Sequence, residues 1–123
     1  MAHNIPNKPD DISIVQEVVD KARDNAFSET NLDLRLCRKR SKNAEFMRAN
    51  GFTNHDVRQA LSNLRVAEYC TTSFEEGKPD AYVFQPCLDG IDVYLKIHVE
   101  DGVVVVSFHD PDRALSFPYR EGK

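Results

Sequence analysis

The sequence predicts an α+β fold, in which N-terminal helices pack on one face of a twisted antiparallel sheet. Two observations carry this prediction. Apolar residues mostly recur at helical spacing up to residue 65, and from residue 66 onward they alternate with polar residues. An Asp101-Gly102 pair between two alternating runs is typical of a β-hairpin. The expected order of elements is α-β-α-α-β-β-β-β.

Three helices are expected in the first half of the chain. The first covers residues 11–26, where two aspartates precede apolar residues that share one helix face: Ile12, Val15, Val18, Val19 and Ala22. A short second helix over residues 44–49 ends at Asn50-Gly51, because glycine is a common C-terminal stop. The third begins at Thr53, with Asp56 three residues later in an arrangement that resembles a capping box.

One strand is expected between the first two helices, and the others follow the third helix. Over residues 32–37, leucines alternate with Asp33, Arg35 and Cys37, as in a half-buried strand. Turn residues at 77–80 and at 89–90 separate the later runs. The later strands are expected over residues 66–74, 81–88, 91–99 and 103–109.

The hairpin around Asp101-Gly102 allows a prediction of register. A two-residue type I′ turn would pair Glu100 with Val103, because both central residues of that turn need positive φ. The buried face would then hold only apolar pairs: Val99 with Val104, Ile97 with Val106, and Leu95 with Phe108. The other face would display the remaining pairs: Tyr94 with His109, Lys96 with Ser107, and His98 with Val105.

Length and composition fit one domain of 123 residues, 41% hydrophobic and 29% charged. We assign residues 10–109 to this domain, residues 1–9 to a flexible arm, and residues 110–123 to a tail along the sheet edge or partly mobile. No apolar run is long enough to span a bilayer, and the N-terminus has no signal-peptide pattern. Three scattered cysteines indicate reduced thiols in a cytoplasmic protein: Cys37, Cys70 and Cys87.

Charge is unevenly distributed along this acidic chain, whose net charge is −4. Residues 35–65 carry eight basic and two acidic side chains, net +6, while residues 66–123 carry five basic and eleven acidic ones, net −6. A basic island of this kind is either a solvated turn and helix face or a surface that binds a polyanion on one side.

The polar face of the hairpin suits the cleavage of RNA. A 2′-hydroxyl can attack the adjacent phosphorus when a base, an acid and positive charge are supplied, and this needs no metal or other cofactor. The candidate catalytic residues are Tyr94, Lys96 and His109. His98 could also take part, and the basic island could hold flanking phosphates through Arg35, Arg38, Lys39, Arg40 and Lys42. The alternatives are an ordinary solvated strand face and a histidine metal site; no carboxylate lies beside His98 and His109 in the expected ladder.

Several short motifs resemble MqsR-type toxins, which belong to the RelE-like mRNA interferases of bacterial toxin–antitoxin systems. The similar stretches are DVYLKI at residues 92–97, VVSF at 105–108, QPCL at 85–88 and, more weakly, residues 51–52 and 56–57. Together they span roughly residues 44–109, and the expected order of elements is similar too. The resemblance implies a RelE-like fold and a metal-independent endoribonuclease that acts on mRNA, free or on the ribosome, and is neutralised by a cognate antitoxin protein.

The resemblance also implies roles for particular positions. Tyr94 matches an active-site tyrosine of the family, and His109 stands where the family carries a functional lysine. Cys70 stands at another family lysine, and Gln85 lies near a basic position, so that Gln85 joins the candidate RNA-binding residues.

Two other functions remain open at the level of sequence. One is a catalytically degenerate RelE-like fold that binds a protein partner by strand addition, which the acidic C-terminal half favours. The other is a nucleic-acid binder without catalysis that uses only the basic residues between 35 and 48.

Overall fold

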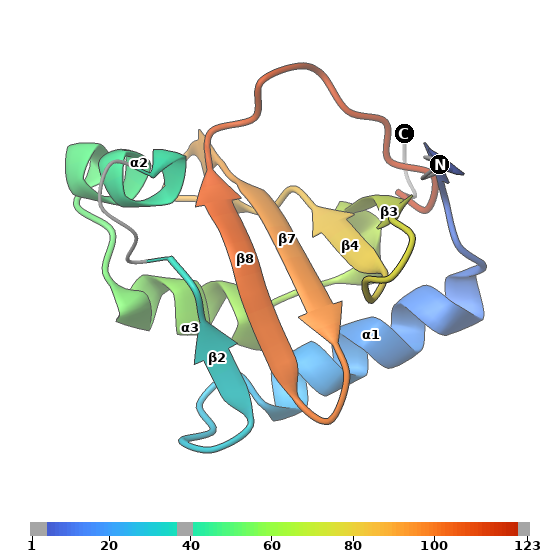
Figure 1. Ribbon diagram of the computed structural model, residues 1–123. Coiled ribbons are helices and arrows are strands. Elements are labelled where there is room, and N and C mark those ends of the chain that lie inside the picture. Colours follow the sequence, from blue (N-terminus) through green and yellow to red (C-terminus); the bar gives the residue numbers. More distant parts are fainter. Residues whose placement is uncertain (1–4, 37–40, 121–123) are drawn as a thin grey trace.

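The computed structural model describes residues 5–36 and 41–120 and shows an α+β fold (Figure 1). The helices are α1 (Ile12–Asp24), α2 (Lys42–Asn50), α3 (Asn54–Ser62) and the 3₁₀ helix η1 (Val66–Glu68). The main sheet has the order β1-β3-β4-β7-β8-β2. Its strands are β1 (Ile5–Lys8), β2 (Leu32–Leu34), β3 (Tyr69–Phe74), β4 (Ala81–Phe84), β7 (Tyr94–Val99) and β8 (Val103–His109). A separate ribbon pairs β5 (Cys87–Leu88) with β6 (Ile91–Asp92).

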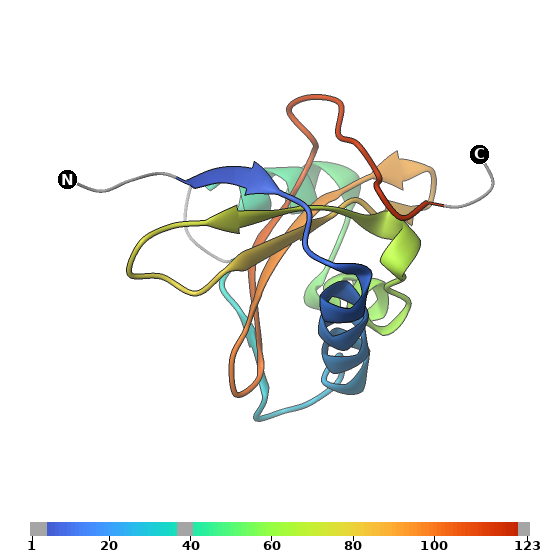
Figure 2. The ribbon, with the colours of Figure 1, turned by 90° about the vertical axis from the view of Figure 1, so that its right-hand side faces the viewer.

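Helices α1 and α3 cover one face of the sheet, which we call the inner face (Figures 1 and 2). The predicted apolar stripe of α1 is buried there except for Ile12, which is exposed at the start of the helix, and the apolar face of α3 is buried too. Helix α2 packs at the end of β8, where the rings of Phe46, Phe52 and Phe108 meet in tilted and edge-to-face arrangements with centroid distances of 5.7–6.1 Å. The predicted α+β class and the positions of these helices are therefore confirmed. No helix in the described part of the chain is long and apolar enough to cross a membrane.

The sheet is mixed, which corrects the prediction of an antiparallel sheet. Strand β2 runs parallel to β8, and Val103 donates its backbone N–H to Asn31 O at 2.9 Å. The backbone at Gly102 approaches the backbone of Asn31 so closely that a Cβ added to Gly102 would be 2.3 Å from Asn31 O. Alternation in the sequence shows that a strand exists, but it says nothing about the direction of the neighbouring strand.

Several element boundaries also differ from the predictions. Residues 5–8, assigned to a flexible arm, form the edge strand β1 against β3. The run 66–74 begins as η1, and the runs 81–88 and 91–99 are each interrupted. Pro86 stands at the first interruption, and a proline has no backbone N–H to give to a sheet ladder. Residue 37, the expected last residue of the strand that begins at Leu32, lies outside the described residues.

The β7–β8 hairpin has the predicted register at one end only. Tyr94 faces His109, Leu95 faces Phe108 and Lys96 faces Ser107, as predicted. Near the turn the register is shifted by one, so that Ile97 faces Val105, His98 faces Val104 and Val99 faces Val103. The predicted type I′ turn is wrong, because neither Asp101 nor Gly102 has positive φ and Glu100 N–H bonds Gly102 O at 2.9 Å.

A β-bulge at Val106 joins the two registers. Consequently Val103 and Val105 point into the core, where Val104 and Val106 were predicted. Strand β2 pairs with β8 only as far as Val105. Beyond that point, Asn43 of α2 makes the hydrogen bonds that hold the bulge in β8. Its amide donates to Val106 O at 3.2 Å, and its Oδ1 accepts from Phe108 N–H at 2.8 Å.

Residues 110–120, which we call the strap, cross the sheet on the face opposite to α1 and α3 (Figure 1). At its start Asp112 pairs with Lys42, with 2.8 Å between Oδ2 and Nζ. At its end the Tyr119 ring stacks on Tyr69, with centroids 6.0 Å apart, and its hydroxyl donates to Asp10 O. The predicted tail therefore lies across the outer face of the sheet in its described part, and not along its edge.

Candidate functional site

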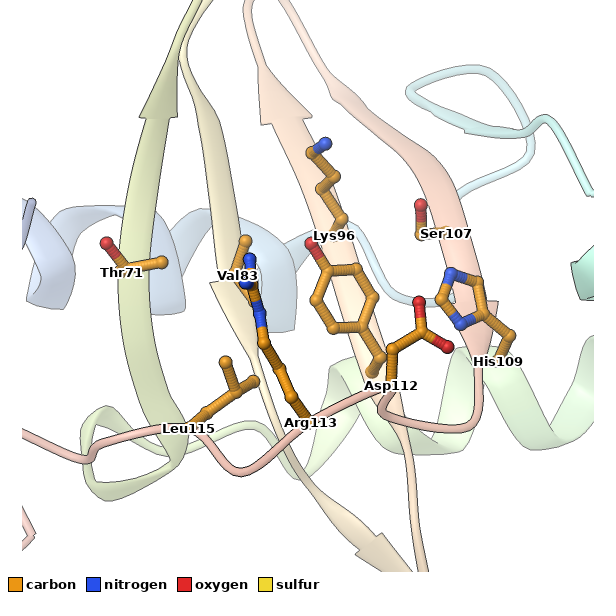
Figure 3. Close-up of a pocket in the computed structure, with 9 residues that line it drawn as sticks. Thr71, Val83, Lys96, Ser107, His109, Asp112, Arg113 and Leu115 are labelled. Carbon is orange, nitrogen blue, oxygen red and sulfur yellow. The ribbon is translucent and has the colours of Figure 1, made fainter. Parts of the chain in front are cut away.

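A pocket of about 430 Å³ lies on the outer face, between the sheet and the strap (Figure 3). Strands β7 and β8 supply its centre, and β3 and β4 supply one side. The strap supplies the rest. The lining residues are Thr71, Val83, Tyr94, Lys96, Ser107, His109, Asp112, Arg113 and Leu115. The three predicted catalytic residues thus line one pocket.

Tyr94 and His109 form a stacked pair in this pocket. Their rings stack with centroids 4.9 Å apart and an interplanar angle of 15°. His109 Nδ1 lies 2.8 Å from Asp110 O. Because a carbonyl oxygen can only accept, this contact keeps the proton on Nδ1 and leaves Nε2 as the nitrogen that can take up or deliver one.

The Tyr94 hydroxyl is a proton donor at neutral pH. Burial raises its pKa above the ordinary value of 10.0, and the positive charge of Arg113 opposes part of this shift. A phenol that stays protonated can donate a hydrogen bond, or deliver its proton to a stronger base such as a departing alkoxide.

Two cations of the pocket, Lys96 and Arg113, have no carboxylate partner among the described residues. Lys96 points along the outer face of β7, and Arg113 extends from the strap toward Val83 (Figure 3). Asp112 is the one acidic lining residue, and its side chain is paired with Lys42. The pocket therefore offers positive charge that is not already neutralised by a described ion pair, which suits an anionic ligand.

The other predicted RNA-binding residues lie outside the pocket lining. Arg35 pairs with Asp33 at 2.9 Å beyond β2, and Lys42 touches the rim only through Asp112. His98 lies on the outer face beyond Lys96, with Nδ1 3.0 Å from Asp80 O. The predicted phosphate-binding residues Arg38, Lys39 and Arg40 lie outside the described residues.

Gln85 and Cys70 do not line the pocket that holds Tyr94. Continuing the β4–β7 register beyond Phe84–Leu95 places Gln85 opposite Tyr94, and Gln85 Oε1 is buried without a hydrogen-bond partner among the described residues. Cys70 lies under the strap, and burial raises the pKa of its thiol to about 12. At neutral pH this thiol is neutral, so it cannot replace the positive charge of a lysine.

Three lining residues from the strap were not predicted from the sequence: Asp112, Arg113 and Leu115. The segment has no periodicity, and its prolines indicate only irregular structure, so nothing local shows that it folds back over the sheet. Thr71 was also missed. In the described residues, no group of three or more His, Cys, Asp or Glu side chains could hold a metal ion.

Comparison with models of known protein families, with curated proteins and with solved structures found no significant match.

Proposed function

We propose that this protein is an endoribonuclease that cleaves single-stranded RNA without a metal ion, in the manner of the mRNA interferases that its hairpin motifs resemble. The single observation that carries the proposal is the stacked Tyr94–His109 pair beside Lys96 in one pocket. These are a titratable imidazole, a protonated phenol and a cation, which are the groups that cleavage by the neighbouring 2′-hydroxyl requires.

In the proposed reaction, His109 Nε2 removes the proton from the 2′-hydroxyl as its oxygen bonds to phosphorus. The bond from phosphorus to the 5′-oxygen breaks, and the Tyr94 hydroxyl delivers a proton to that oxygen. Lys96 stabilises the negative charge of the pentacoordinate phosphorane. The products are a 2′,3′-cyclic phosphate and a 5′-hydroxyl, and the proton on His109 returns to the Tyr94 phenolate through water.

The test is cleavage of a labelled single-stranded RNA by the purified protein in EDTA. We expect products that end in a 2′,3′-cyclic phosphate, and no cleavage where the attacking nucleotide is 2′-deoxy. His109→Ala should reduce kcat by roughly 10²–10⁴-fold, the usual contribution of a general base. Intact RNA with the wild-type protein, or equal cleavage by His109→Ala, would refute the proposal.

His55→Ala is the matched control. His55 lies in α3 on the other side of the molecule from the strap, where its ring packs against Phe27 at 6.0 Å. This substitution removes an exposed histidine of the same type without touching the pocket, so cleavage should be unchanged.

The proposed biological setting, a toxin that acts on mRNA and is neutralised by an antitoxin, rests on the motif resemblance. Expression of the wild-type protein in bacteria should slow growth and shorten mRNA, and His109→Ala should relieve both effects. Co-expression of a small protein encoded in a neighbouring reading frame should restore growth.

A second candidate function is that of a catalytically degenerate module that binds a protein. The observation that favours it is the neutral, buried Cys70, which stands where the resembled family carries a lysine. This alternative predicts a stable complex with a partner protein and no RNA cleavage, and it is excluded if cleavage depends on His109.

A further inference from the structure

Arg113 differs from the other residues of the candidate site in its origin. It lies beyond the last strand, in the strap, and it still lines the pocket that holds Tyr94, Lys96 and His109. Nothing in the hairpin motifs involves this position. Its placement depends on the strap crossing the sheet and not on the local sequence.

The strap is attached on both sides of Arg113, which fixes where the guanidinium can reach. One residue before it, Asp112 pairs with Lys42 of α2. Two residues after it, Leu115 is half-buried and lines the same pocket. Further on, Tyr119 stacks on Tyr69 and bonds to Asp10 O. An arginine held between such anchors loses less conformational freedom on binding than one on a free tail.

Arg113 has no ion-pair partner among the described residues, which leaves its guanidinium available to an anionic ligand in the pocket. Several other cations of the described chain already have a partner: Arg35, Lys42, Arg65 and Lys78 pair with carboxylates, and Arg120 lies 3.7 Å over the Phe117 ring. Arg113 takes part in none of these pairs, and its side chain is exposed at the pocket. A planar guanidinium with several N–H donors is well suited to bind a phosphate through two parallel hydrogen bonds.

We infer that Arg113 is a phosphate-binding residue which the strap supplies to the RNA site, where it holds a phosphate of the strand next to the one that is cleaved. This inference rests on the proposed function for the identity of the ligand. Its contribution is to binding, because the proton transfers are assigned to His109 and Tyr94. Removal of Arg113 should therefore raise KM and leave kcat largely unchanged.

Binding can be measured apart from cleavage in a His109→Ala background, with a fluorescent, unstructured oligouridylate as probe. Adding Arg113→Ala should raise Kd by roughly 10- to 100-fold, as expected for one lost charged hydrogen-bonding contact. It should also reduce the slope of log K against log salt by about 0.7, the value for one phosphate contact to a single strand. Arg113→Lys keeps the charge, so it should keep the slope and recover only part of the affinity.

Arg120→Ala is the matched control, because it removes the same charge from the same strap outside the pocket. Its slope and Kd should equal those of the background. Equal melting temperatures for the variants would show that the fold is intact, as expected for an exposed side chain.

The two proposals can fail separately. If the wild-type protein cleaves RNA and Arg113→Ala changes neither KM nor the salt slope, the role of Arg113 is refuted and the nuclease stands. If no cleavage occurs but probe binding depends on Arg113 as described, the nuclease is refuted and the phosphate site stands. If the probe does not bind to the background protein at all, the role of Arg113 is also refuted.

Discussion

Asn43 helps to determine the position of His109, although the two residues are far apart in the sequence. The Asn43 side chain bonds both Val106 O and Phe108 N–H, and so it fixes the bulge that restores the register of Tyr94 with His109. Without this bulge, the shifted register near the turn would continue and would place Tyr94 opposite another residue. The stacked pair therefore depends on a side chain from α2.

Asn43→Ala should destabilise the fold by about 1–3 kcal/mol, because it leaves a backbone N–H and a backbone C=O without their partners in a partly buried place. Urea denaturation measures this change. The same variant should lower RNA cleavage by loosening His109, even at temperatures where it remains folded.

Asn50→Ala is a useful comparison, since the Asn50 amide bonds to Phe46 O one turn earlier in the same helix, at 2.9 Å, and to no other group in the part of the chain that the structure describes. We expect a smaller loss of stability and no loss of cleavage. Equal effects of the two variants would argue against a role for the bulge.

The Tyr94–His109 pair could be predicted from the sequence, and the residues that support it could not. Tyr94 and His109 lie at the open end of two alternating runs that a turn joins, so the sequence pattern brings them near each other, and the bulge at Val106 sets them directly opposite. Residues 103–106 are four consecutive valines, which carry no information about which face is buried, so a shift of one residue there leaves no mark in the sequence. Asn43 acts across 63 and 65 positions, a distance that periodicity does not reach.

At the scale of elements, the strap forms part of the pocket wall. The reactivity of Cys70, which lies beneath the strap, can be used to measure how often the strap opens. The thiol is 4% exposed beneath the strap, and its pKa is raised to about 12 by burial. In a variant with Cys37→Ser and Cys87→Ser, Cys70 should therefore react slowly with a thiol reagent at pH 8, through openings of the strap.

Tyr119→Ala removes the stacking on Tyr69 and the bond to Asp10 O, so the strap should open more often. We expect Cys70 to react at least about tenfold faster, while the far-ultraviolet circular dichroism of the sheet and helices is unchanged. Phe74→Leu, which alters an aromatic residue away from the strap, should leave the rate as it was. An unchanged rate in Tyr119→Ala would mean that the strap is held elsewhere.

The elements themselves show the limit of prediction from sequence. Helices α1 and α3 could be predicted because their apolar stripes are local, and α3 also has the predicted bond from Thr53 N–H to the Asp56 carboxylate, whereas the Asp11 side chain makes no capping bond to α1. The parallel pairing of β2 and the course of the strap could not, because each is decided by contacts with strands that are distant in the chain.

For the molecule as a whole, pH should affect the attachment of the strap only at the extremes. The hydrogen bond from Lys42 lowers the pKa of Asp112 below 3.8, and the same bond raises the pKa of Lys42 above 10.5. Stabilisation by Asp112 is present above 3.8 and is lost as pH falls through its lowered pKa. Stabilisation by Lys42 is present below 10.5 and is lost as pH rises through its raised pKa.

A carbon NMR titration checks this expectation. The Asp112 carboxyl should titrate below 3.8, and Lys42→Met should move its midpoint back toward that value. Both side chains are exposed, so the pair contributes little to global stability and should weaken with added salt.

The bond between Tyr119 and Asp10 joins residues 109 positions apart. This is the longest loop closed by any hydrogen bond named above, although the entropic cost of closing a loop grows only slowly with its length. During synthesis, Arg113 and Tyr119 emerge only after every strand has left the ribosome. Under the proposed function, the phosphate contact of Arg113 would therefore be added to the RNA site only after translation has passed the strap.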